Sequence, residues 1–407
     1  MNLLYWLIKA VNMVRRRRAF SRQLPKLDTV LHQTYGDPDN PEDAYQAMKR
    51  DFWNHAIQES NQDISLNPRD AKAYYDRGNS NTRIGQHERA IQDYDEAIRL
   101  DPEYADAYQS RGLSYADMGQ HERAIQDYDE AIRLKPQDAG SISTSVYHHS
   151  RGCSLVAIGE DERAIEDFDE STRAIPDYSP DCEQRAGAYA RLGQVDRAIQ
   201  EYDQLISISP KYPNAYRQRG RTYAAVGQHE RAIQDFDQVI SLEPENAEAY
   251  WSRGNILMSL AELEQANQKR VEQVNLAIQD FGQAIKFDPE NAVAWTDYGK
   301  PFLFLGQVID PIDVFDTAIH HDPEYAPAYY YRGCARASRG EHQAAIDNFD
   351  EAIRLDPEDA EAYANRAREY ASIGNEPGAQ GDIDRAVELG FDTGPLEQAI
   401  QDIKARR

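Results

Sequence analysis

Small, aromatic and polar residues recur along this chain with a period of thirty-four positions. The sixteen residues GQHERAIQDYDEAIRL at 85–100 return unchanged at 119–134. Within each copy the apolar residues are three and four positions apart, which is the spacing of one face of an α-helix. Aligning the copies gives nine repeats, which begin near residues 71, 105, 145, 179, 213, 247, 292, 326 and 360. A fixed internal period predicts a repeat architecture rather than two or three globular domains.

Each repeat predicts two helices joined by a short turn. A glycine at the fifteenth position ends the first helix, because glycine adopts the left-handed conformation that closes helices. A proline at the thirty-second position cannot continue the second helix. In the second repeat, the fourth, eighth, fifteenth, twentieth, twenty-fourth and thirty-second positions are Tyr108, Gly112, Gly119, Ala124, Tyr128 and Pro136. The pattern therefore predicts an all-α chain.

A single two-helix unit cannot bury its apolar face, so neighbouring copies must cover one another. The small residue at the eighth position leaves a notch in the first helix. We expect the large aromatic residue of the next copy to enter this notch. Identical repeats would then present identical knobs and holes along the chain.

This arrangement of small, large and proline positions resembles the tetratricopeptide repeat family over residues 71–391. The resemblance implies an antiparallel helix pair per repeat and a right-handed superhelical solenoid. It also implies that the first helices line a concave groove for peptides or partner proteins. We expect residues 1–26 to be a separate basic segment, 27–70 a linker with a degenerate first repeat, and 392–407 a polar capping helix. The solenoid would then contain about nine to ten repeats. The degenerate repeat would place Ala44 and Ala47 in its first helix, Ala56 in its second and Pro68 at its end.

One departure from the family pattern recurs in most copies. The seventh position is arginine and the twenty-third is acidic in most repeats, whereas the seventh repeat has Tyr298 and Val314. We infer that the two positions touch across the helix pair, as a partly buried ion pair in most repeats and as an apolar pair in one. Other acids, such as Asp95 before Arg99, have the i,i+4 spacing of solvated helix pairs. The arginines are Arg77, Arg111, Arg151, Arg185, Arg219, Arg253, Arg332 and Arg366.

Three stretches break the regularity. The extra residues AGSIST at 139–144 predict a surface loop. Eleven extra residues in the sixth repeat predict a longer, protruding helical hairpin, which either is solvated or binds a partner. The seventh repeat carries Pro301 inside its first helix and Pro311 early in its second. Its residues 302–305, FLFL, form either a compensating local core or an exposed docking patch.

By the same resemblance, positions two, five, nine, twelve and thirteen of each first helix face the groove. The candidate partner-binding residues read from these positions are Arg191, Arg217, Arg221, Trp251, Asn255, Met258 and Tyr330. Three arginines in an acidic protein favour an acidic partner segment, and the aromatic residues and methionine favour apolar anchors. The alternative is that neighbouring acids pair with these arginines internally.

The charge distribution separates the N-terminus from the rest. The formal net charge is −25, but residues 1–26 hold seven basic side chains and no acid, which leaves 38 basic and 70 acidic residues elsewhere. This balance disfavours a nucleic-acid partner, since phosphate binding depends on clustered basic residues. The N-terminal pattern predicts an amphipathic helix that either anchors on an anionic membrane surface or packs on protein. The anchor residues would be Leu3, Leu4, Trp6, Leu7, Ile8, Arg15, Arg16, Arg17 and Arg18.

Candidate chemistry is sparse. Three scattered cysteines favour a reducing compartment, and we expect a cytoplasmic protein, or one held peripherally on the cytoplasmic face of a membrane. We find no phosphate-binding loop and no paired zinc motif, and expect no cofactor, no metal and no enzymatic activity. His148, His149 and Cys153 lie close enough in sequence to suggest a metal, but packing roles are favoured. The predicted function is a non-catalytic protein-binding scaffold, and the alternative is an assembly factor or chaperone-like carrier.

Overall fold

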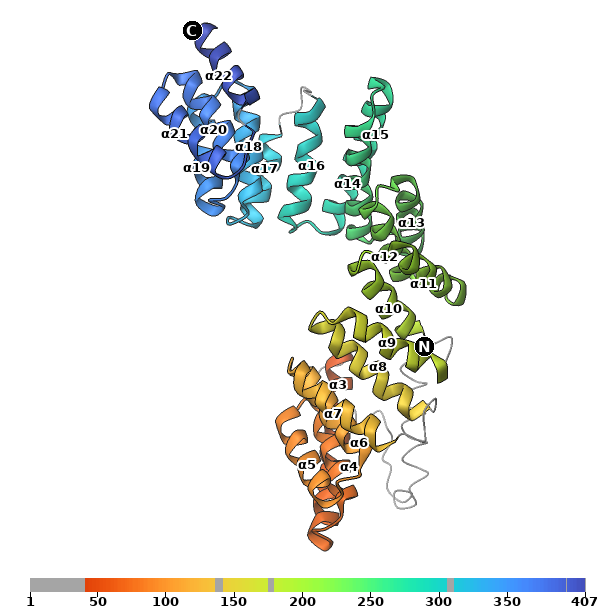
Figure 1. Ribbon diagram of the computed structural model, residues 1–407. Helices are drawn as coiled ribbons and strands as arrows, with labels where there is room; N and C mark the ends of the chain where they lie inside the picture. The colour runs from red at the N-terminus through yellow and green to blue at the C-terminus, as the bar shows by residue number, and fades with distance from the viewer. Residues whose placement is uncertain (1–40, 136–141, 175–178, 306–310, 393, 407) are drawn as a thin grey trace. The chain divides into compact units, whose positions relative to one another are not determined.

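A computed structural model describes residues 41–135, 142–174, 179–305, 311–392 and 394–406. These residues form α-helices joined by short connections, with no strand among them, as predicted (Figure 1). The helices are α3 (Pro41–Leu66), α4 (Ala71–Arg83), α5 (His87–Leu100), α6 (Ala105–Asp117), α7 (His121–Leu134), α8 (Ile142–Ala157), α9 (Asp161–Ala174), α10 (Ser179–Arg191), α11 (Val195–Ile208), α12 (Pro213–Ala225), α13 (His229–Leu242), α14 (Ala247–Leu263), α15 (Asn267–Phe287), α16 (Ala292–Leu305), α17 (Ile312–His321), α18 (Ala326–Ser338), α19 (His342–Leu355), α20 (Ala360–Ile373), α21 (Glu376–Glu388) and α22 (Gly394–Arg406).

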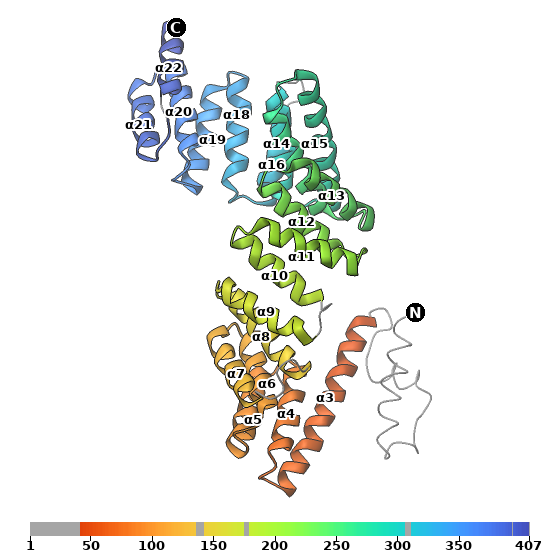
Figure 2. The same cartoon turned by 45° about the vertical axis from the view of Figure 1, so that its right-hand side comes forward.

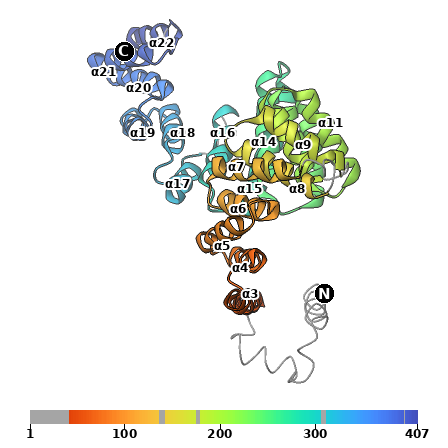
Figure 3. The ribbon, with the colours of Figure 1, turned by 60° about the horizontal axis from the view of Figure 1, so that its bottom comes forward.

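The chain divides into two compact units, residues 1–184 and 185–407, with the boundary inside α10. Within the first unit, α3 lies along α4, and successive pairs follow in chain order (Figures 2 and 3). Within the second unit, the pairs from α12 onward stack in the same way, up to α22. The first helix of each described pair begins at the predicted repeat start, except α8, which begins three residues earlier, at Ile142. The turn glycines also behave as predicted: Gly85 and Gly119 have φ of 76° and 73°.

The notch at the eighth position is filled from within the same repeat, and our expectation that the next copy fills it is wrong. A Cβ placed on Gly112 would lie 2.7 Å from the ring of Tyr128, and one on Gly333 would lie 2.7 Å from the ring of Phe349. Both rings come from the second helix of the same pair and are fully buried. The close approach lets the two helices of one pair pack tightly, so the notch stabilises the pair itself.

This packing gives a prediction for Gly333→Ala. In an open helix, the change from glycine to alanine stabilises by about 0.5–1 kcal/mol. At Gly333 the new methyl group would overlap Phe349, so we expect a net loss of about 1–2 kcal/mol in unfolding free energy. Gly381→Ala in α21 is the matched control, because nothing lies within 4 Å of its Cβ position. Urea unfolding should show opposite signs for the two variants, and a gain in both would contradict tight packing at the notch.

The predicted pair between the seventh and twenty-third positions is present. Arg219 donates from Nε and Nη2 to the two carboxylate oxygens of Asp235, at 2.9 and 2.6 Å. Asp235 is 3% exposed. Burial raises the pKa of Asp235, and the bonds from Arg219 oppose that shift. Equivalent contacts join the other pairs: Arg77–Asp93, Arg111–Asp127, Arg151–Asp167, Arg185–Glu201, Arg253–Asp280, Arg332–Asn348 and Arg366–Asp382.

Seven of these arginines also reach back to the helix that precedes their own. Nη1 of Arg111 donates to Asp95 at 2.5 Å, whereas Arg99 bonds Glu96 on its own helix. The expected i,i+4 pairing of Asp95 with Arg99 is therefore wrong, because each side chain bonds another partner. Both side chains lie on a solvated face as expected, with 53% and 65% of their area exposed. Each such arginine thus joins three helices. We call these contacts the arginine ladder, whose backward bonds are Arg77–Asn61, Arg111–Asp95, Arg151–Asp129, Arg219–Asp203, Arg253–Asp237, Arg332–Asp316 and Arg366–Asp350.

The ladder is interrupted between α14–α15 and α16–α17. Tyr298 replaces the arginine, Val314 replaces the acid of the same pair, and Gly282 replaces the acid of the preceding pair. The Cβ position of Gly282 lies 3.8 Å from the Tyr298 ring. Tyr298 packs edge-on against Phe302 and contacts the cluster of Leu257 and Phe281. All three polar positions have changed together, so no buried charge is left without a partner.

Other irregular stretches follow local sequence. α3 is one continuous helix rather than the predicted degenerate hairpin, because residues 41–66 contain no glycine or interior proline to form a turn. α8 begins at Ile142, so the end of the AGSIST insertion extends a helix instead of a loop. The eleven added residues lengthen α14 and α15, and Arg270 of α15 lies 4.2 Å from the Phe304 ring centre.

The seventh repeat accommodates its prolines differently. Pro301 lies inside α16, whereas Pro311 precedes the first residue of a short α17. Phe302 is 5% exposed, and residues 303–305 are half-buried, which favours the local core over an exposed patch. At the C-terminus, Leu396 and Ile400 of α22 are buried against Ala367 and Ile383.

Candidate functional site

Two of the predicted groove arginines converge on a residue that sequence reasoning did not single out. Arg217 and Arg221 lie one turn apart on α12, and both bond the carboxylate of Glu248 at the start of α14. The Arg217–Glu248 distance is 2.9 Å, and Arg217 also donates to Asn214 at 3.1 Å. The side chain of Arg221 is 47% exposed. The cluster therefore combines two guanidinium groups with one shared carboxylate, and internal pairing neutralises it only in part.

The three candidates on α14 lie next to this cluster. Trp251 is one turn beyond Glu248 and donates from Nε1 to Asp297 of α16 at 2.7 Å. Asp297 is nearly buried and also bonds Lys300 at 2.6 Å. Asn255 donates to the carbonyl oxygen of Trp251 at 3.1 Å, so its amide is engaged with its own helix. Met258 packs with Trp251 against the core of α14 and α15.

A pocket of about 270 Å³ opens beside Trp251. Its walls come from α14, from the end of α15 and from the start of α16. Val293 is 37% exposed at its edge. The lining residues are Ala247, Glu248, Trp251, Ala284, Asp288, Asn291, Val293 and Ala294. The pocket and the arginine pair share Glu248, which makes them one continuous site.

The other two candidates lie on other helices. Tyr330 of α18 donates to Glu361 at 3.1 Å and accepts from Asn365 at 2.9 Å, both in α20. Burial raises the pKa of its hydroxyl well above the usual range. Arg191 ends α10, and one of its guanidinium nitrogens is 3.4 Å from the Cβ position of Gly187. We call the cluster of Arg217, Arg221, Glu248 and Trp251, with its adjoining pocket, the α12–α14 site.

The sequence carried a signal for Glu248. Arg217 is at position five of its repeat and Glu248 at position two of the next, and Tyr330 and Glu361 hold the same two positions. A search for complementary residues at these positions would have found the pairing. Asp297, at position six of the repeat after Trp251, would have appeared in the same way.

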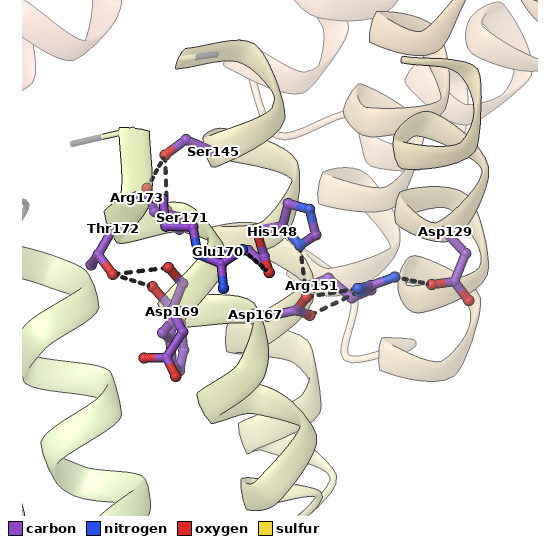
Figure 4. A network of polar contacts seen from close by, with 11 residues as sticks. Asp129, Ser145, His148, Arg151, Asp167, Asp169, Glu170, Ser171, Thr172 and Arg173 are labelled. Carbon is purple, nitrogen blue, oxygen red and sulfur yellow. Dashed lines mark hydrogen bonds and ion pairs between the residues drawn. The ribbon is translucent and has the colours of Figure 1, made fainter. Parts of the chain in front are cut away.

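The histidines of α8 occupy two separate polar networks. His148 bonds Asp167 at 2.8 Å, and Arg151 connects that carboxylate to Asp129, as Figure 4 shows. His149 bonds Asp181 and contacts Cys153. Across the part of the chain that the structure describes, no cluster of three histidine, cysteine or acidic side chains has the arrangement of a metal site.

The predicted N-terminal anchor, Leu3 to Arg18, lies outside the described residues. Among the helices that the structure does describe, none has both the length and the hydrophobicity needed to cross a bilayer.

Several family models match the chain. A model described as TPR repeat matches residues 78–119, 187–227, 220–260 and 333–374, and one described as Tetratricopeptide repeat matches 105–138. No curated protein sequence matches the chain.

Many solved structures share the helix-pair arrangement. YrrB, a TPR protein with an unusual peptide-binding site, is 23% identical, covers 48% of this chain and 97% of its own, and has a TM-score of 0.43. MamA from Desulfovibrio magneticus is 20% identical, covers 43% and 96%, and has a TM-score of 0.40. A tetratricopeptide repeat protein from Parabacteroides merdae is 16% identical, covers 64% and 97%, and has a TM-score of 0.48.

The matched residues lie in the observed helix pairs and include turn glycines with positive φ, such as Gly85, Gly119 and Gly227. The chain belongs to the tetratricopeptide repeat family.

Proposed function

We propose that this protein is a non-catalytic scaffold whose α12–α14 site binds an acidic segment of a partner protein, with an apolar partner side chain in the adjoining pocket. The tetratricopeptide fold is one that serves protein–protein interaction. The observation that carries the proposal is the sharing of one carboxylate, Glu248, by two guanidinium groups.

The charges of the site favour an anionic group. Two positive groups and one negative group leave one net positive charge, and Arg221 is the more exposed of the two arginines. A partner carboxylate can bond the open side of Arg221 while Glu248 stays in place, or it can replace Glu248 on both arginines. Charge-assisted bonds of this kind are stronger than neutral ones. The acid-rich remainder of the chain would repel the same segment, which restricts where it binds.

The pocket supplies the apolar part of the recognition. Trp251 is part of the pocket lining, and Asp297 accepts a hydrogen bond from its indole N–H. A fixed aromatic surface beside Val293 and Ala294 suits a partner's aliphatic or aromatic side chain. The combination favours a peptide with an acidic residue a few positions from an apolar one.

Binding of fluorescent peptides, measured by anisotropy, tests the proposal. The panel should contain peptides with an acidic run beside leucine or phenylalanine, and peptides of equal length in which lysine replaces each acid. Arg221→Glu should weaken binding of the acidic peptides about tenfold or more, as expected for one lost charge-assisted bond. Glu248→Gln removes the competing carboxylate and should strengthen binding several-fold.

Arg231→Glu is the matched control, because it makes the same charge change on α13, where Arg231 bonds Gln228. It should leave binding unchanged. If Glu248→Gln and Arg221→Glu had no effect on any acidic peptide, the arginines would serve internal pairing alone and the proposal would be wrong.

A further inference from the structure

Cys153, His149 and Asp181 are arranged in the first unit as a nucleophile, a base and an orienting acid. Nδ1 of His149 lies 2.5 Å from Oδ1 of Asp181. Nε2 of the same ring lies 3.7 Å from Sγ of Cys153, one turn further along α8. A thiol next to an imidazole that is held by a carboxylate is the arrangement that activates cysteine nucleophiles.

The burial of the three groups suits these roles. Asp181 is 0% exposed, and its second carboxylate oxygen has no hydrogen-bond partner in the structure. Its charge is therefore balanced mainly by His149. Cys153 and His149 are both partly exposed, the histidine side chain by 25%. Both occupy positions five and nine of their repeat, which the family resemblance places on the concave face.

We propose that Cys153 is a nucleophilic thiol activated by the His149–Asp181 pair, and that it is a site of modification by hydroperoxides. This reaction is a stoichiometric modification and not a catalytic turnover. It concerns the first unit and is independent of the α12–α14 site.

The neighbouring charged groups leave this pair intact. Burial alone would lower the pKa of His149, but its bonds to Asp181 and Cys153 raise the pKa to about 10. The ring is therefore an imidazolium ion at neutral pH, and its Nε2–H can stabilise a thiolate. On α9, Asp167 is engaged by His148 and Arg151.

On the described helices that pack on α8, several titratable groups are neutral or already bonded to other partners. On α7, Tyr128 lies close to Cys153, and burial raises the pKa of its hydroxyl well above the usual range, so it remains neutral. Asp129 is bonded by Arg151. On α6, Asp106 is bonded by Tyr147. On α10, the facing acid is Asp181 itself.

The reaction balances without any further group. The thiolate sulfur attacks the terminal oxygen of a hydroperoxide, and a sulfur–oxygen bond forms as the oxygen–oxygen bond breaks. The sulfur is oxidised to a sulfenic acid, and the peroxide is reduced to an alcohol, or to water for hydrogen peroxide. The leaving oxygen takes the proton from Nε2 of His149, and the sulfenic acid keeps the hydrogen that the attacked oxygen already carried.

Alkylation of the full chain by iodoacetamide, read at each cysteine by mass spectrometry, measures the thiolate directly. A free thiol with a pKa near 8.5 loses about fiftyfold in rate from pH 8.5 to about 6.5. We expect the Cys153 rate to fall less than about threefold over that range. Cys334 is an internal reference, because burial raises its pKa to about 12. Dimedone should trap a sulfenic acid at Cys153 after treatment with hydrogen peroxide.

Variants of the two adjacent histidines separate activation from folding. His149→Gln should restore the steep pH dependence at Cys153 and slow its oxidation at least about tenfold. His148→Gln is the matched control, since His148 also bonds an aspartate but does not contact the sulfur. Thermal melts would verify that both variants fold. The proposal is wrong if Cys153 in the unaltered protein follows the ordinary pH profile, or if His148→Gln has the same effect as His149→Gln.

Discussion

Replacing Arg219 by leucine will lower the free energy of unfolding by about 3–5 kcal/mol, as expected when one member of a buried ion pair is removed. The reason is the environment of Asp235. This carboxylate is 3% exposed and is bonded through both oxygens to Arg219. Without the guanidinium group, Asp235 must stay charged and unsolvated or take up a proton. Asp203, the other partner, has a side chain that is 54% exposed and can be hydrated.

The double variant Arg219→Tyr with Asp235→Val is the matched control, since it copies the residues at the equivalent positions of α16 and α17. It should recover most of the stability that Arg219→Leu loses, although neither replacement carries a charge. Urea unfolding followed by circular dichroism measures the difference, and hydrogen exchange in α12 and α13 localises it. Equal losses of unfolding free energy in the single and double variants would show that a buried Asp235 without its arginine does not destabilise the protein.

The converse change, Tyr298→Arg, should be the second most damaging, with a loss of about 2–4 kcal/mol from burying an unpaired charge. At this junction the arginine would meet Val314 and Gly282 instead of two carboxylates. It would also disrupt the packing of Tyr298 on Phe302. The α16–α17 pair should lose protection from hydrogen exchange first, because its second helix has only 10 residues.

Adding Val314→Asp and Gly282→Asp to Tyr298→Arg rebuilds the arginine ladder at the junction. The triple variant should be more stable than Tyr298→Arg alone. If the triple variant were even less stable, the backbone at this junction could not accommodate the three polar side chains. The local geometry would then require the residues now present, and they would not be a simple replacement for the arginine and its two acidic partners.

The sequence predicts the helix pairs and the arginine pairing because both repeat. Because the pattern recurs in nine copies, an uncertain assignment in one copy is resolved by the others. The joint replacement of the arginine and the acid by Tyr298 and Val314 indicates contact from the sequence alone. A period alone does not tell which neighbour a side chain meets. The notch of Gly112 could receive an aromatic ring from its own repeat or from the next one, and both choices have the same spacing.

The binding residues were harder to predict, because each occurs in one copy. Arg217 and Arg221 were identified by their positions, whereas Glu248 was hidden among many acidic residues. The contact of His149 with Asp181 links residues 32 positions apart in two successive repeats. Sequence reasoning placed His149 near Cys153 but had no means of identifying the carboxylate that orients the ring.

A charge-swap measurement at the α12–α14 site tests the proposed scaffold function most directly. Anisotropy titrations would compare the unaltered chain and Arg221→Glu against two peptides that differ only by a glutamate or a lysine beside the same apolar anchor. We expect the unaltered chain to prefer the glutamate peptide and Arg221→Glu to prefer the lysine peptide, with each mismatched pair weaker by about tenfold. An unchanged preference in Arg221→Glu, or no binding of either peptide to the unaltered chain, would contradict recognition of an acidic segment at this site.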